Sequence, residues 1–144
     1  MLKISKLADY ATVIMHWLAS HSDEHFSAAA ISDSVHIALP TVSKVLKMLN
    51  DAGLVNSVRG VQGGYHLSRP AQEVNLAQVI AAIDGQLAMT ECAQLDSCCQ
   101  YGKQCSISEN WQYINKVIYD VLGKVSIQDM TKDLASMGSR TDVI

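Results

Sequence analysis

All four cysteines of the 144-residue chain lie in one polar stretch, residues 91–106, which we call the cysteine segment and which reads ECAQLDSCCQYGKQCS. Its thiols are Cys92, then after five residues the adjacent Cys98 and Cys99, then after five more Cys105. Structural zinc sites favour cysteine pairs roughly two to four residues apart, so this spacing is wide for zinc. Three thiolates about six residues apart suit a bulky iron–sulfur cluster, which takes soft sulfur ligands. A metal-free thiol switch, a zinc site and cysteines without a shared role remain open alternatives.

The rest of the composition favours a cytoplasmic protein without a membrane partner. The sequence has no run of about 18 apolar residues, the length that a transmembrane helix needs. Residues 1–20 place charges among apolar positions and lack the small-residue cleavage site of a signal peptide. Persistent disulfides are rare in the cytosol, which favours metal binding or redox sensing by the cysteines.

The first half of the chain has the pattern of three helices and a hairpin. We predict helices over residues 4–19, 27–35 and 40–53, and strands over 54–58 and 64–68. Ser27 is a suitable N-cap for the second helix, Pro40 suits the first turn of the third, and Gly53 ends it. This is the element order of a winged helix-turn-helix domain with a two-stranded β wing.

Outward-facing residues of this half predict contact with double-stranded DNA. Residues 1–70 carry six Lys or Arg and five Asp or Glu, against five and nine in residues 71–144, so phosphate contacts should come from the first half. Polar and basic side chains of the third helix point away from its apolar face, and Arg59 lies in the glycine-rich turn RGVQGG. The candidate DNA-contacting residues from this pattern are Thr41, Ser43, Lys44, Lys47 and Arg59. Winged helices that bind only proteins are the alternative.

The second half contains helices that a small DNA-binding domain does not need. We predict a short helix over 76–85 and a long amphipathic helix over 106–125, starting with a capping box of Ser106 and Glu109. A short final helix over 126–134 follows a second Ser-x-x-Asp pattern. We expect the long helix to form a homodimer, because helix-turn-helix proteins usually bind two half-sites as a symmetric pair.

The expected fold class is therefore mainly α, with a winged helix-turn-helix domain, a two-stranded wing and a long C-terminal dimerisation helix. The expected division is residues 1–70 for the DNA-binding domain, 71–106 for the short helix and cysteine segment, 107–134 for the dimerisation and final helices, and 135–144 for a flexible tail. We expect no enzyme and no small-molecule substrate, because no phosphate-binding glycine motif, nucleophile–base pair or paired carboxylates are evident.

Three stretches together resemble the IscR/NsrR-type, or Rrf-two, family of bacterial regulators. These are LVNSVRGVQGGYHLSRP, VIAAIDG, and the cysteine segment followed by Trp111 and a long helix; the resemblance covers roughly residues 1–134. It implies a homodimeric transcription factor, expected to be a repressor, with one iron–sulfur cluster, [2Fe–2S] or [4Fe–4S], in each subunit. The branch that it resembles most regulates the SUF operon for iron–sulfur assembly. Nitric-oxide sensing at the same cluster is a further alternative.

The resemblance also assigns roles to residues. The cluster ligands fall on Cys92, Cys98 or Cys99, and Cys105. Where IscR-like proteins place a histidine ligand this chain has Ser108, whereas Asp9 matches the partner-subunit ligand of NsrR-like proteins; His16 and Glu109 are the other candidates for the fourth ligand. Base recognition is assigned to Pro40, Thr41, Ser43 and Lys44 at the start of the third helix, and to Arg59 in the wing. An acidic residue stands at the Ser43 position in IscR-like proteins, so their operator sequence does not transfer.

Overall fold

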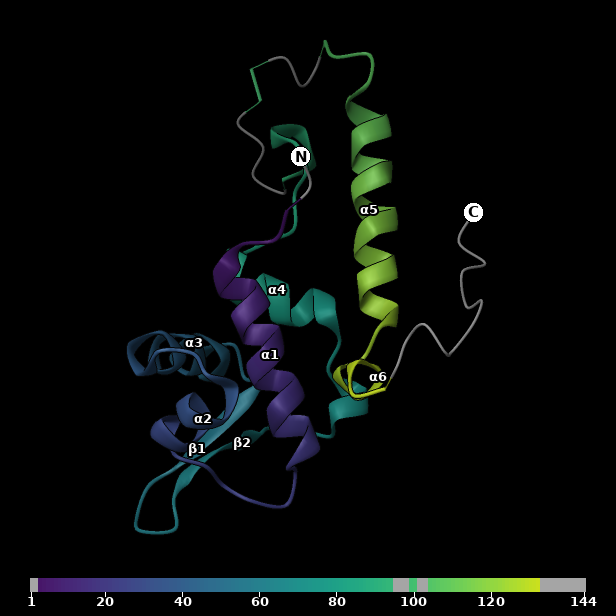
Figure 1. Cartoon of the computed structure of the whole chain (residues 1–144). Helices are drawn as coiled ribbons and strands as arrows, with labels where there is room; N and C mark the ends of the chain where they lie inside the picture. Colours follow the sequence, from purple (N-terminus) through teal and green to yellow (C-terminus); the bar gives the residue numbers. More distant parts are fainter. Residues whose placement is uncertain (1–2, 95–98, 101–103, 133–144) are drawn as a thin grey trace.

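Three helices and an antiparallel hairpin form the first part of the computed structural model, which describes residues 3–94, 99–100 and 104–132 (Figure 1). These elements are α1 (Lys6–Ser20), α2 (Ala28–Val35), α3 (Leu39–Asp51), β1 (Val55–Val58) and β2 (Gly64–Leu67). The strands pair antiparallel from Val55 opposite Leu67 to Val58 opposite Gly64. The predicted winged helix-turn-helix order is confirmed.

The second part adds three helices and two short 3-10 turns. These are η1 (Ala71–Glu73), α4 (Leu76–Asp84), η2 (Glu91–Ala93), α5 (Ser108–Lys124) and α6 (Ile127–Met130). The longest described helix, α5, stands beside the rest of the molecule, with α4, α6, η2 and the segment before η2 near it (Figure 1). No helix within the described ranges is long and apolar enough to cross a membrane.

Most of the predicted helix ends are confirmed. The Ser27 hydroxyl accepts a hydrogen bond from Ala30 N at 3.1 Å, and Pro40 lies in the first turn of α3. Gly53 follows α3 with φ +72° and Gly85 follows α4 with φ +79°, a left-handed conformation that favours glycine. At α6, the Asp129 carboxylate accepts a bond from Ser126 N and the Ser126 hydroxyl accepts one from Asp129 N, each at 3.0 Å.

Two predictions at the C-terminal helices are wrong. Helix α5 begins at Ser108 with Ile107 as its N-cap, so Ser106 and Glu109 form no capping box. A backbone turn replaces it, because Ser108 N donates to Cys105 O at 3.4 Å. The final helix ends at Met130, since Thr131 N and Lys132 N bond three residues back and tighten the chain into a turn. The predicted tail, residues 135–144, lies outside the described residues.

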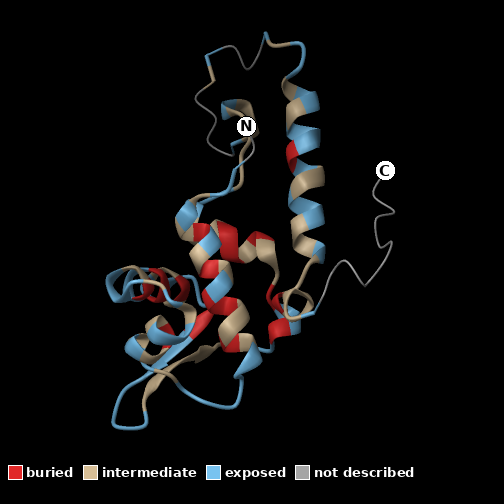
Figure 2. Ribbon diagram, in the orientation of Figure 1, coloured by how far each residue is buried: buried red, intermediate tan, exposed pale blue. Residues whose placement is uncertain are grey.

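One hydrophobic core joins both halves of the chain around α1. Figure 2 shows that buried residues concentrate in α1, α3, α4 and the region of α6, whereas α5 is mostly exposed. Helix α1 contributes Ala11, Ile14, Met15 and Leu18, which cluster with the buried face of α3 and with Val74, Val79 and Ile127 from the second half. Residues that follow the wing in sequence therefore help to hold α1 in place.

Pairs of backbone hydrogen bonds connect segments that are distant in sequence. Phe26 and Tyr65 exchange N–H···O bonds of 3.2 and 2.7 Å, which fix the loop before α2 against the wing. Leu76 N donates to Val125 O and Ile127 N donates to Val74 O, which join the starts of α4 and α6. The two backbones of each pair lie so close together that little space is left between them for a side chain.

Gly64 occupies the tightest of these crossings and generates a prediction. A Cβ there would lie 2.6 Å from the Phe26 backbone, and its φ of +154° is unfavourable for other residues. Gly64→Ala should therefore lower the free energy of unfolding by about 1–3 kcal/mol, as overpacking does. Urea unfolding followed by circular dichroism measures the change. Ser57→Ala, an exposed substitution on the opposite strand, is the control, and equal stability of the two variants would contradict the prediction.

Candidate DNA interface and cysteine segment

Helix α3 presents a polar face opposite its buried face. Val42, Val45, Leu46 and Leu49 are buried. Among the predicted DNA-contacting residues, Pro40, Ser43, Lys44 and Lys47 are exposed, and Thr41 is half-buried. The 3.6-residue repeat thus leaves two amines and a hydroxyl accessible on one surface, the chemistry that reaches phosphates and base edges in a major groove.

The wing places Arg59 at the far end of the hairpin. Arg59 is exposed in the turn between the strands, which is closed by a bond of 3.0 Å from Gly63 N to Gly60 O. Val61 in the same turn is fully exposed. Sequence reasoning missed Val61, although an apolar side chain inside a glycine-rich turn could have identified it. The turn extends away from the core (Figure 1), so both side chains can enter a groove without moving packed residues.

Two histidines meet at the base of the wing. The rings of His25 and His66 lie 4.4 Å apart between centroids, and His66 Nδ1 is buried without a hydrogen-bond partner in the described part of the chain. Burial lowers the pKa of His66, and the nearby His25 lowers it further. His66 is therefore disposed to remain neutral in the folded protein.

The described thiols of the cysteine segment are separated by residues 95–98 and 101–103, which lie outside the described residues. Cys92 is part of η2, Cys105 lies three residues before α5, and Cys99 lies between them; all three are free and half-exposed. Cys98 lies outside the described residues. Within residues 3–94, 99–100 and 104–132, no three His, Cys, Asp or Glu side chains are close enough together to hold a metal ion. The structure therefore does not gather these thiols around one point.

The donor chemistry nevertheless fits a cluster. Free thiols can ionise to soft thiolates, the ligands that iron–sulfur clusters take. Cys105 lies three residues before the first residue of α5, so a ligand there would be held close to a regular helix.

The candidates for a fourth ligand lie on α1 and α5. Asp9 is exposed in the first turn of α1, His16 is half-exposed farther along that helix, and Glu109 is exposed in the first turn of α5. Ser108 is the first residue of α5. None of them forms a metal-binding group with the thiols in the described part of this single chain.

Sequence reasoning missed two residues of α5 whose side chains form hydrogen bonds with the segment that contains Cys92. Asn115, the only buried residue of α5, bonds to the backbone of Leu87 and Met89, and Gln112 Nε2 donates to Cys92 O at 3.2 Å. Asn115 lies four residues after Trp111 and three before Ile118, so it interrupts an apolar row. A polar amide within an apolar row is the sequence feature that could have identified Asn115.

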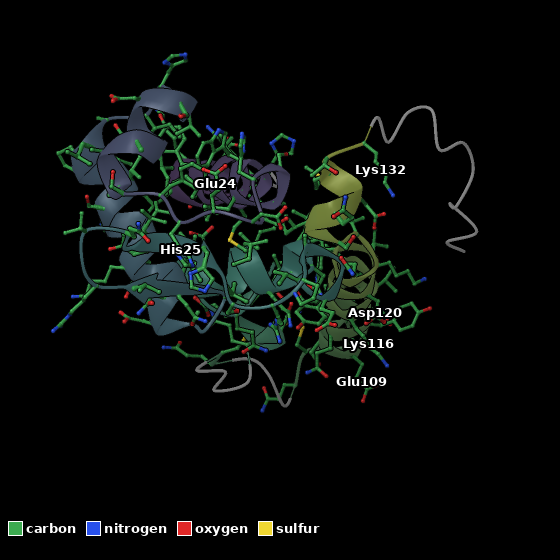
Figure 3. All side chains as sticks on the ribbon, turned by 90° about the horizontal axis from the view of Figure 1, so that it is seen from below. Glu24, His25, Glu109, Lys116, Asp120 and Lys132 are labelled. Atoms are coloured by element: carbon green, nitrogen blue, oxygen red, sulfur yellow. The ribbon has the colours of Figure 1, made fainter. Side chains whose placement is uncertain are left out.

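Helix α5 presents different chemistry on its different sides. Ile114 and Val121, seven residues apart, are exposed on one side of the helix, and the N-cap Ile107, seven residues before Ile114, is exposed as well. Charged side chains project away from the molecule on another side (Figure 3): Glu109, Lys116 and Asp120. These exposed apolar side chains make this side of the helix a candidate surface for a partner.

Comparisons with known proteins agree with this arrangement. A sequence profile of the Rrf2 family, described as an iron-dependent transcriptional regulator, matches residues 4–133. The chain is 39% identical over 102 residues to a protein of Neisseria meningitidis serogroup A named as an HTH-type transcriptional regulator, which covers 71% of this chain and 68% of that protein. It is 32% identical over 133 residues to the HTH-type transcriptional regulator IscR of Xenorhabdus nematophila, covering 92% and 80%.

Solved structures give the same fold. IscR of T. potens has a TM-score of 0.71 at 27% identity, covering 97% of this chain and 93% of that one. CymR, the global cysteine regulator of B. subtilis, also has a TM-score of 0.71, at 26% identity, covering 92% and 100%. These relatives and neighbours are transcriptional regulators and not enzymes, as the absence of catalytic motifs predicted.

The environment of His66 predicts a pH dependence of stability. Because its pKa is lowered from the usual 6.5 in the folded protein, the unfolded chain binds the proton more readily. The free energy of unfolding should therefore fall as pH decreases from about 7.5 to about 5.5, and His66→Gln should reduce that slope. Urea titrations at each pH measure it. The exposed His36→Asn is the control, and a slope in His66→Gln equal to that of the unmodified chain would refute the prediction.

Proposed function

Because the chain belongs to the Rrf2 family of transcriptional regulators, we propose that it is a homodimeric repressor that senses an iron–sulfur cluster and binds operator DNA. Its proposed targets are iron–sulfur assembly genes, as in the SUF-regulating branch that the sequence resembles. The observation that carries the proposal is the combination of an exposed basic helix and wing with a four-cysteine segment that ends two residues before α5.

In the proposed complex α3 enters the major groove. Pro40, Thr41 and Ser43 at the start of α3 face base edges, and Lys44 and Lys47 neutralise phosphates. Arg59 enters the adjacent minor groove, whose negative potential attracts a guanidinium group. The exposed Val61 beside it is placed for apolar contact with the sugar edge.

Helix α5 supplies the proposed dimer interface. The exposed row of Ile107, Ile114 and Val121 packs against the same row of a second copy, so a two-fold axis pairs identical surfaces. The charged residues on another side of α5 remain in water. A symmetric pair of this kind would present two α3 helices, one to each half-site of an operator.

The proposed cluster ligands are Cys92, Cys105 and one of Cys98 and Cys99. A bound cluster would provide iron that is lost when oxygen or nitric oxide attacks the cluster, or when iron is limiting. Asp9 of the partner subunit is the proposed fourth ligand; its exposure on α1 supports this role, since an exposed carboxylate is available to a second chain. A carboxylate is a weaker ligand for iron than a thiolate, which favours a labile site.

A thiol switch without metal is the second candidate function. The observation that favours it is that Cys92, Cys99 and Cys105 are free, half-exposed and not grouped around one point. Such thiols are accessible to oxidation, and a disulfide between two of them would reshape the cysteine segment.

The DNA-binding proposal predicts different effects for two kinds of residue. Arg59→Ala should weaken binding to a selected operator by about 1–3 kcal/mol and relax its sequence preference. Lys47→Ala should weaken binding to all sequences and reduce the slope of log affinity against log salt by about 1. Fluorescence anisotropy over a salt series measures both. Lys132→Ala, an exposed lysine beyond α6, should change neither quantity; equal behaviour of all three variants would exclude this docking mode.

The cluster proposal predicts the mass and colour of the protein. Protein purified without oxygen should be brown, and native mass spectrometry should find a dimer carrying iron and sulfide. Cys92→Ser and Cys105→Ser should lose that mass, because each removes a ligand, and only one of Cys98→Ser and Cys99→Ser should do so. Asp9→Ala should retain less iron than Asp51→Ala, a matched change at an exposed carboxylate.

The same measurement separates the alternatives. A colourless dimer that gains disulfides on oxidation would replace the cluster with the thiol switch. Zinc in the native mass would indicate a structural metal site. Unchanged iron content and operator affinity in Asp9→Ala would remove the partner-subunit ligand from the proposal.

A further inference from the structure

A buried amide fixes the approach to the cysteine segment. Residues 85–90, which we call the stem, connect α4 to η2. Asn115 of α5 has only 9% of its surface exposed, and it is the one buried polar residue found in the described part of the chain. Its Nδ2 donates to Leu87 O at 2.9 Å, and its Oδ1 accepts from Met89 N at 3.2 Å. One carboxamide therefore satisfies a donor and an acceptor of the stem.

A second amide extends this attachment to the first thiol. Gln112 lies one turn before Asn115 on neighbouring positions of α5, and its Nε2 donates to Cys92 O at 3.2 Å. The stem therefore runs antiparallel to α5, with Leu87 and Met89 bonded at Asn115 and Cys92 bonded nearer the helix N-terminus. The Thr90 hydroxyl lies 3.1 Å from Cys92 Sγ, which restricts the thiol itself.

We propose that Asn115 and Gln112 are positioning residues that hold Cys92 against α5 before any cluster binds. This inference rests on the proposed cluster-binding function. The two amides belong to a regular helix, so their positions are fixed relative to the N-terminus of α5, which Cys105 precedes. Ordering one ligand in advance removes part of the entropy that ligation of a loose loop would cost.

The burial of Asn115 supports a positioning role rather than simple packing. An apolar side chain at this place in the row of Trp111 and Ile118 would pack α5 without any polar atom to satisfy. The amide instead specifies which backbone atoms of the stem face the helix, and so fixes the register of the stem along α5. Gln112 is exposed and contributes little to packing, so its bond to Cys92 serves position alone.

Two variants of the whole 144-residue chain test the inference. Asn115→Leu keeps the number and branching of the side-chain heavy atoms and removes both bonds to the stem, whereas Gln112→Ala removes the bond to Cys92. Asn110→Ala, an exposed amide of the same helix for which no side-chain hydrogen bond is described, is the matched control. The readouts are amide hydrogen exchange of residues 87–92 in the apo protein, iron and sulfide per chain, and the rate of cluster loss in air.

We expect both variants to speed exchange in the stem and to shorten the lifetime of the cluster several-fold. Dimer mass and the apo unfolding midpoint of Gln112→Ala should match those of the control. Unchanged exchange in both variants would overturn the hydrogen-bonded arrangement, and faster exchange with normal cluster lifetime would overturn the positioning role. If the unmodified protein takes up no cluster on anaerobic reconstitution, the proposed function fails, and the exchange data then report separately on the stem.

Discussion

The burial of one side of α1 is the constraint on which the rest of the structure depends. Ala11, Ile14, Met15 and Leu18 of this helix pack against the buried face of α3 and against residues that follow the wing, including Val79 and Ile127. The helix-turn-helix elements therefore share their core with α4 and α6. Because interiors are close-packed, a shift of α1 has to move elements on both sides of it.

The same helix lies between the two candidate sites. The wing lies near the C-terminal end of α1, whereas η2 and the start of α5 lie beyond its N-terminal end (Figure 1). Ser5, the N-cap of α1, bonds to the Asp84 carboxylate through its N–H at 3.2 Å and its hydroxyl at 2.5 Å. Asp84 is the last residue of α4, immediately before the stem, so the stem is connected to α1 at its start and to α5 at Asn115. A coupling free energy of about 1–3 kcal/mol between sites is enough to change operator occupancy several-fold.

Helix α5 shows how one amphipathic pattern serves two surfaces. Its apolar residues cover too much of the helix circumference to fit one core face. The side with Ile107, Ile114 and Val121 is exposed in the single chain. The side toward its own chain is less apolar than expected, because it contains Asn115. A buried amide is tolerated there because both of its polar atoms find backbone partners.

The sequence alone determined the local features of this protein. Periodicity located the helices, Ser27, Pro40 and Gly53 marked their ends, and the glycine-rich turn identified the wing, because each of these signals acts within a few residues. The exposure of Lys44, Lys47 and Arg59 also followed from the pattern. The cysteine spacing and the wing motif together identified the family.

Only the tertiary structure decided the contacts between distant segments. The start of α5 at Ser108 depends on a backbone turn from Cys105, which displaced the locally favoured cap at Ser106. The pairing of His25 with His66 and of Asn115 with the stem joins residues whose own surroundings in sequence give no sign of their partners. Hydrogen bonds and burial of this kind are set by which elements pack together, and that is determined by the whole core rather than by any short stretch of sequence.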